Sequence, residues 1–215
     1  MRAGAAIALI QLATSAVAAA AGLNLEVYGG APVNFSTPLS IEQAGQPTLR
    51  MTARYETRPF EAPWYYHAHI GYWSGNTEWG VELTHQKIFL TNPPPQVGAF
   101  AASHGYNLVT LNRGWELPFN LWMRVGLGAV ISHPESTVRG QALGENGGFW
   151  ALGYYLSGAA ATAAIQKRIL VIGGFFLAGT GMVSAAYAVL PVVDGHARAP
   201  NLALHGLFGI GYRCR

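Results

Sequence analysis

Polar and apolar residues alternate along several segments of this chain, as expected for β-strands, whose successive side chains point to opposite faces. In residues 119–132 every odd position is apolar, whereas most even positions are small or polar. The same division recurs in residues 150–156 and 201–213. Segments of about ten residues with one apolar face and one small or polar face are typical of the wall of a transmembrane β-barrel.

The spacing of such segments predicts about eight strands. Besides the three segments above, strands are expected at about 23–31, 64–74, 77–89, 104–113 and 169–190. The Ser-Gly-Asn sequence between Trp73 and Thr77 predicts a tight hairpin turn. Long connections rich in Pro, Gly or polar residues are expected at 90–103, 132–148 and 191–200. The sequence therefore predicts an all-β, antiparallel, up-and-down transmembrane barrel.

The alternation of short and long connections also predicts the orientation of the barrel. Outer-membrane barrels have short turns in the periplasm and long loops outside the cell. We therefore expect both termini in the periplasm and residues 32–63 as the first external loop.

A helical interpretation is open for residues 169–193, which carry no charge and are long enough to cross a bilayer as a helix. Against it, Gly173-Gly174, Gly179 and Gly181 weaken a helix. Alternation also places Phe175 and the neighbouring odd-numbered residues on one face of a strand, and Thr180 and the neighbouring even-numbered residues on the other. We therefore favour a strand.

The N-terminus predicts the compartment. A positive start at Met1-Arg2, small apolar residues up to Val17 and several Ala-x-Ala choices before Ala21 are the parts of a secretory signal peptide. We expect residues 1–21 to be that signal peptide and residues 22–215 to form one barrel domain in the bacterial outer membrane.

The composition supports a membrane location and limits the partners. Only 11% of the residues are charged, against about 25% in ordinary soluble domains. The net charge of +3 is small and scattered, so a nucleic-acid groove is not expected. The expected partners are outer-membrane lipid and lipopolysaccharide, and the expected state is a monomer. The lone Cys214 excludes an internal disulfide.

The face opposite the apolar wall predicts a polar interior. It contains His67, His69, Glu82, Thr84, Gln86, Tyr106, Thr110, Asn112, Asn120, Arg124 and His205. A two-residue turn at Gly75-Asn76 would set His69 opposite Glu82 and His67 opposite Thr84. These groups could hold a metal or perform acid/base chemistry. We favour a structural network in which Arg124 pairs with Glu82 or Glu26, because eight-stranded barrels have room only for side chains.

Several short motifs carry a resemblance to a known family. They are Tyr65-Tyr66 with Trp73, then Glu82-x-Thr84-His85-x-Lys87, then Gly105-Tyr106-Asn107 with Thr110 and Asn112. In these motifs, and in its general layout through Gly126-x-Gly128 and Ser157-Gly158, the chain resembles the outer-membrane lipid A oxidases. Members of that family are small barrels that oxidise the proximal glucosamine of lipid A to an aminogluconate unit with molecular oxygen.

The resemblance implies a site at the outer end of the barrel. Its implied catalytic residues are Glu82, Thr84, His85, His104 and Asn107. Lys87 would meet lipid phosphates, and a divalent metal with molecular oxygen as co-substrate would supply the chemistry. Strand parity alone places His85 on the lipid side, at headgroup level.

The chain also departs from the family pattern. The third motif begins His104-Gly105-Tyr106, where the family has Asp-Gly-His, and Gly173-Gly174 replaces an expected Glu. The chain ends on Arg215 and not on an aromatic residue. A non-catalytic structural or adhesion-type outer-membrane barrel therefore stays open as the alternative. Acyl transfer is a minor alternative, since it needs a Ser nucleophile near a His and no His-x-Ser pair occurs.

Overall fold

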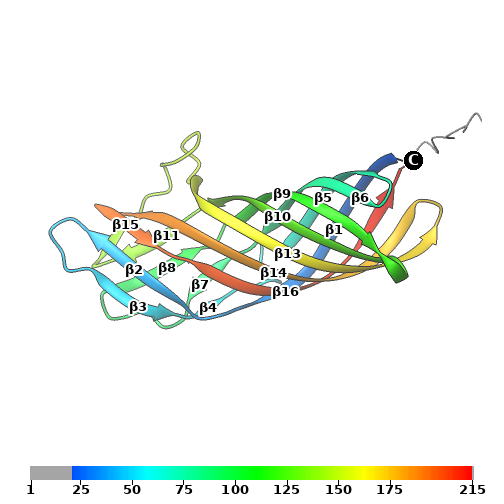
Figure 1. Ribbon diagram of the computed structural model, residues 1–215. Coiled ribbons are helices and arrows are strands. Elements are labelled where there is room, and N and C mark those ends of the chain that lie inside the picture. The colour runs from blue at the N-terminus through cyan, green and yellow to red at the C-terminus, as the bar shows by residue number, and fades with distance from the viewer. Residues whose placement is uncertain (1–20, 215) are drawn as a thin grey trace, which may run out of the picture.

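A closed antiparallel barrel of eight long strands forms the body of the protein (Figure 1). The computed structural model describes residues 21–214, apart from the side chains of residues 170 and 171. The barrel strands are β1 (Ala21–Asn34), β5 (Tyr66–Ser74), β6 (Thr77–His85), β9 (Tyr106–Leu117), β10 (Leu121–Ser132), β13 (Tyr155–Ile172), β14 (Phe175–Val192) and β16 (Asn201–Arg213). Each pairs with the next in chain order, and β16 pairs with β1. The predicted up-and-down barrel is confirmed.

The wall follows the alternation read from the sequence. In β10 the side chains of Met123, Val125 and Leu127 are exposed on the outside, whereas Trp122 and Arg124 are buried inside. In β16 and β14 the same division runs along almost the whole strand. An exposed apolar band around a buried polar interior is the arrangement that a lipid bilayer requires. The protein is a transmembrane β-barrel of the bacterial outer-membrane type.

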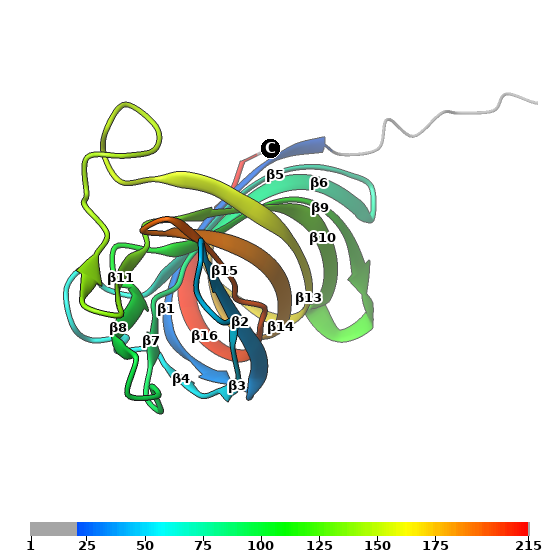
Figure 2. The same cartoon turned by 90° about the vertical axis from the view of Figure 1, so that its left-hand side faces the viewer.

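The two ends of the barrel differ strongly (Figure 1). One end carries the short connections, which are Gly75-Asn76, the 3-10 turn η1 (Pro118–Asn120) and Gly173-Gly174. The C-terminus lies at this turn end, and β1 begins there, because Ala21 pairs with Ser74. The long connections all gather at the opposite, loop end, which faces the viewer in Figure 2. In outer-membrane barrels the end with long loops faces outside the cell.

The loop end carries a folded β-structure that we call the cap. Strands β15 (Gly195–Arg198), β2 (Thr37–Gln43) and β3 (Leu49–Ala53) extend the barrel sheet beside β14. A second sheet consists of β12 (Gln141–Ala142), β11 (Glu135–Val138), β8 (Val97–Ala102), β7 (Ile88–Leu90) and β4 (Tyr55–Glu56). One apolar core joins cap and barrel, from Leu39 and Ile41 in β2 through Phe100 in β8 to Val130 in β10.

The cap was not predicted: most of its residues were expected to form loops, and Ile88 and Phe89 were expected to end the barrel strand 77–89, whereas β6 ends at His85 and they belong to β7. Its strands are only two to seven residues long, so each alone gives an alternation too short to predict a strand. Their apolar side chains become a core only when the sheets meet above the barrel.

Two of the expected strands are wrongly placed. Residues 150–156 lie in a turn region and in the first two positions of β13. Residues 169–190 are not one strand, because Gly173-Gly174 turns the chain between β13 and β14. The helical alternative for residues 169–193 is also wrong, since β13, β14 and this turn account for them. Asn120 was expected inside the barrel but lies exposed in η1.

No helix in residues 21–214 is long and apolar enough to cross a membrane. The predicted signal peptide falls outside the described residues except for Ala21, which begins β1.

Candidate functional site

The hairpin of β5 and β6 sets the register of the polar interior. Its two-residue turn places His69 opposite Glu82 and His67 opposite Thr84, as predicted. Both imidazoles and the carboxylate are buried. His67 Nδ1 lies 2.9 Å from the Thr84 hydroxyl, and His69 Nδ1 lies 3.4 Å from a Glu82 carboxylate oxygen.

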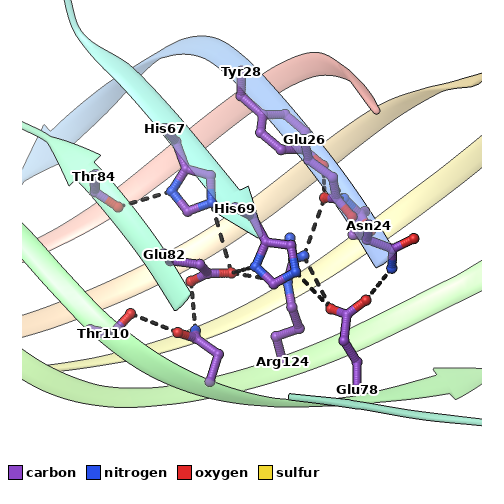
Figure 3. Close-up of polar contacts among 12 residues, drawn as sticks. Asn24, Glu26, Tyr28, His67, His69, Glu78, Glu82, Thr84, Thr110 and Arg124 are labelled. Atoms are coloured by element: carbon purple, nitrogen blue, oxygen red, sulfur yellow. Dashed lines mark hydrogen bonds and ion pairs between the residues drawn. The ribbon is translucent and has the colours of Figure 1, made fainter. Parts of the chain in front are cut away.

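Arg124 lies at the centre of this interior (Figure 3). Its Nε is 3.0 Å from Glu82 Oε1 and its Nη1 is 3.2 Å from Glu26 Oε2, so it pairs with both predicted partners. Asn112 donates a hydrogen bond of 2.6 Å to the other oxygen of Glu82. Every oxygen of Glu82 therefore faces a donor from the barrel itself.

Two charged residues of this interior were missed by the sequence interpretation. Glu78 faces inward from β6 and contacts His69 at 2.8 Å. Arg168 faces inward from β13 and pairs with Glu26. Glu78 precedes Glu82 by four positions, which puts both on one strand face and could have revealed it. Arg168 was hidden because its strand was misplaced.

The interior network, defined as Glu26, Glu78, Glu82, Arg124, Arg168 and His69, is close to electrically balanced. Three carboxylates face two guanidinium groups, and His69 lies between Glu78 and Glu82. One proton on His69 would bring the network to neutrality. Buried ion pairs of this kind are stable only when charges and hydrogen bonds are matched. The geometry is that of a structural network filling a narrow lumen.

A buried serine and histidine also meet inside the barrel. Ser184 Oγ is 2.7 Å from His205 Nε2, and Tyr65 Oη is 2.8 Å from the other ring nitrogen. All three residues are at most 4% exposed. A nucleophile must be reached by its substrate, so this trio is better suited to packing than to acyl transfer.

A pocket of about 490 Å³ lies on the outer wall just below the cap, and we call it the rim pocket. Its lining residues are Pro63, Tyr66, Leu83, His85, His104, Asn107, Val109, Ile131 and Tyr154. Leu83 is paired with Val109, and Asn107 with Ile131, across neighbouring strands. The pocket therefore has an apolar floor on the membrane wall and polar groups at its upper edge.

His85 is held firmly in the rim pocket. Its ring stacks on Tyr66, with centroids 5.0 Å apart and an interplanar angle of 13°. Its Nδ1 lies 2.7 Å from Asn107 Oδ1. Since an amide oxygen can only accept, Nδ1 carries the hydrogen and Nε2 has the lone pair in the neutral ring. Nε2 is buried and has no partner.

The expected catalytic residues thus divide into two groups. His85, His104 and Asn107 come together in the rim pocket. Glu82 and Thr84 face the lumen on the other side of the wall and belong to the contacts of Arg124 and His67. Parity predicts this split, because residues 83 and 85 face the opposite side to residues 82 and 84.

Lys87 lies away from the rim pocket. It is only 2% exposed and donates a 2.7 Å hydrogen bond to the backbone oxygen of Glu61. Burial lowers its pKa below the usual lysine value, although the nearby Glu61 opposes this. The predicted contact of Lys87 with lipid phosphates has no support in this placement.

Comparison with known proteins gives similarity in structure only. The sequence matches no protein-family model and no curated protein sequence. The solid-state NMR structure of outer membrane protein AlkL in lipid bilayers shares 10% identity, with 90% of each chain covered and a TM-score of 0.48. The crystal structure of OprG from Pseudomonas aeruginosa shares 12%, covering 90% of this chain and 96% of that one, with a TM-score of 0.43. The crystal structure of neisserial surface protein A shares 9% sequence identity, covers 91% of this chain and 99% of that one, and has a TM-score of 0.39.

Proposed function

We propose that this outer-membrane barrel binds a lipopolysaccharide-type lipid in the rim pocket and oxidises a sugar of its headgroup, in the manner of the lipid A oxidases that it resembles. The observation that supports the proposal is the convergence of His85, His104 and Asn107 on one pocket open to the membrane side of the wall. Scattered polar residues at the rim would have favoured a purely structural barrel.

The pocket matches an amphipathic ligand. Leu83, Val109 and Ile131 continue the apolar wall and suit an acyl chain, whereas His85 and Asn107 stand where a headgroup would begin. Tyr66 and Tyr154 on the sides can pack against a sugar ring. Aromatic side chains with one polar end favour this boundary between lipid and water. The pocket lies at the loop end, which corresponds to the leaflet that contains lipopolysaccharide.

The chemistry would depend on His85. Asn107 fixes its tautomer and leaves the lone pair on the buried Nε2, which would take a proton from a sugar hydroxyl that a bound headgroup brings to it. Oxidation of a reducing sugar end removes two protons and two electrons, from this hydroxyl and from the C–H bond of the same carbon, and gives a lactone. Molecular oxygen, the co-substrate that the resemblance implies, would accept the two protons and two electrons as hydrogen peroxide. Addition of water to the lactone would then give the aminogluconate, one oxygen atom heavier than the starting sugar.

Mass spectrometry of lipid A tests this proposal. Cells that express the protein should contain a lipid A species one oxygen atom heavier than cells that lack it. The same species should be missing from cells that express His85→Ala at equal barrel levels. Unchanged lipid A in all three strains would refute the oxidase function.

A non-catalytic adhesion-type barrel is the second candidate. The observation that favours it is a set of strongly exposed aromatic side chains near the loop end, with Phe60 at 85% and Trp150 at 90% exposure. Large exposed aromatics often mark contact surfaces. Loss of surface or cell binding on replacing Phe60 and Trp150 by Ser, with lipid A unchanged by the protein, would favour this candidate.

A further inference from the structure

Three potential metal ligands meet beside the rim pocket, and strand pairing brings them together. His104 lies in the turn before β9, and His133 directly follows β10. Tyr106, the first residue of β9, pairs with Ser132, the last residue of β10, so His104 and His133 lie close together. The backbone NH of His133 also donates a hydrogen bond of 2.8 Å to the carbonyl of Gly105. Glu135, two residues after His133, begins β11. We call these three residues the rim triad.

The side chains of the rim triad converge. His104 Nδ1 is 3.1 Å and His133 Nδ1 is 3.8 Å from Glu135 Oε1. The three candidate ligand atoms all lie within 4.8 Å of one another. The two imidazole rings are 5.0 Å apart, and His133 also packs against Tyr154 at 5.0 Å.

His133 gives a second, independent indication of a ligand. Its side chain is only 9% exposed, yet its Nδ1 faces the triad without a hydrogen-bond partner. A buried polar atom without a partner is unfavourable, so a bound ion at this atom would stabilise the arrangement. Gly153 packs closely against the other side of this ring, since a Cβ at that position would lie 2.4 Å from His133 Nε2, so the ring is fixed with Nδ1 toward Glu135.

We propose that the rim triad binds one divalent transition-metal ion through the two imidazoles and the Glu135 carboxylate. Around such an ion, with bonds of about 2.0–2.2 Å, neighbouring ligand atoms stand about 3.3 Å apart. His104 and Glu135 are 55% and 36% exposed, so their side chains can turn to reach this spacing. Two imidazoles and one carboxylate are a ligand set for zinc and for non-haem iron.

The ligand count indicates the role of the ion. Three protein ligands leave at least one coordination position open, which is the arrangement of catalytic and not of structural sites. His104 lines the rim pocket, so the open position would lie next to the proposed headgroup. This role rests on the proposed function, whereas metal binding itself does not.

Metal titration of the untagged full-length barrel, refolded in detergent, tests the site. Co²⁺ should give a visible absorption band that saturates at one ion per barrel, and Zn²⁺ should compete with it. Metal affinity should fall at least about tenfold in each of the variants His104→Ala, His133→Ala and Glu135→Gln. Replacing a residue that only hydrogen-bonds to a metal ligand already lowers metal affinity about 10–100-fold. Heat-dependent gel mobility checks that each variant is folded.

Two further variants make the result specific. His196→Ala removes another exposed imidazole, 3.5 Å from Glu42 in the cap, and should leave Co²⁺ binding unchanged. His85→Ala should also bind Co²⁺ normally although it no longer modifies lipid, so failure of the metal site and failure of the proposed function are separable. Absence of saturable Co²⁺ binding would overturn the inference, as would unaltered binding by folded His104→Ala and Glu135→Gln. The exposed His104 keeps the test valid even where His133→Ala does not fold.

Discussion

The guanidinium of Arg124 lies 3.0 Å from the carboxylate of Glu82 in the closed lumen, and both side chains are at most 2% exposed. The sequence offers two roles for Glu82, a catalytic one implied by the resemblance and an ion pair with Arg124, and this contact supports the ion pair. The polar residues therefore divide into two groups. Those inside the barrel pair with one another and hold the fold together, and those that a ligand can reach lie on the outer rim.

Replacing Arg124 by Met should destabilise the barrel more than replacing Glu82 by Gln. Without Arg124, three carboxylates face only Arg168 and His69, and breaking a buried pair in this way costs about 3–5 kcal/mol. With Glu82→Gln, Arg124 still has Glu26 at 3.2 Å. Urea unfolding in detergent, followed by tryptophan fluorescence, measures both. The double variant should recover part of the loss; equal damage from the two single variants without recovery would contradict the assigned pairing.

Replacing Leu127 by Arg should impair membrane insertion. Leu127 is 72% exposed in the middle of β10 on the outer face. A lipid-facing Arg near the bilayer midplane costs about 2–4 kcal/mol. Heat-dependent gel mobility after refolding into vesicles reports the folded fraction. A folded fraction equal to that of the unchanged protein would show that this face does not meet lipid.

Two glycines in the wall should respond differently to alanine. A Cβ at Gly128 would lie 1.9 Å from the backbone oxygen of Val109, so β9 and β10 must shift, and overpacking costs about 1–3 kcal/mol. Gly181 in β14 has no atom within 4 Å of its Cβ position. Urea midpoints should therefore fall for Gly128→Ala and stay level or rise for Gly181→Ala. The reverse order would be inconsistent with the described strand packing.

The barrel should not conduct ions. Trp122 and Arg124 fill the lumen, and Arg168 lies against the Trp122 ring at 4.1 Å. Eight-stranded barrels enclose little more than their own side chains. Single-channel recording in planar bilayers should show no stable openings. A reproducible large conductance would require a wider lumen or an oligomeric pore.

The sequence predicts the wall and the hairpin register well because both depend on local rules. Alternation assigns Leu127 outward and Arg124 inward without knowledge of any neighbour. A two-residue turn then fixes His69 opposite Glu82.

Prediction fails where the two faces of a strand have similar residues. In β13 the outward Ala163 faces lipid and the inward Ala164 faces the lumen, so hydrophobicity does not distinguish them. As a result the alternation predicts the strand too early, at the Trp150 turn, and predicts a strand through the turn at Gly173-Gly174.

The candidate site could be predicted only in part. Parity puts His85 on the outer wall, but its burial depends on Tyr66 and on the cap above it. The approach of His104 to Glu135 depends on how β8, β9 and β11 meet at the loop end. Such contacts between distant segments have no counterpart in local alternation.

Oxidation of purified lipid A by the reconstituted barrel tests the central claim most directly. The unchanged protein, His85→Ala and the cap variant His196→Ala are refolded into vesicles that contain lipid A with a free reducing sugar, in air and with a divalent transition-metal ion present. Mass spectrometry should find a product one oxygen atom heavier with the unchanged protein and with His196→Ala, and none with His85→Ala. Absence of this product with the folded unchanged protein, or equal product with His85→Ala, would contradict the assignment of the rim pocket as an oxidase site.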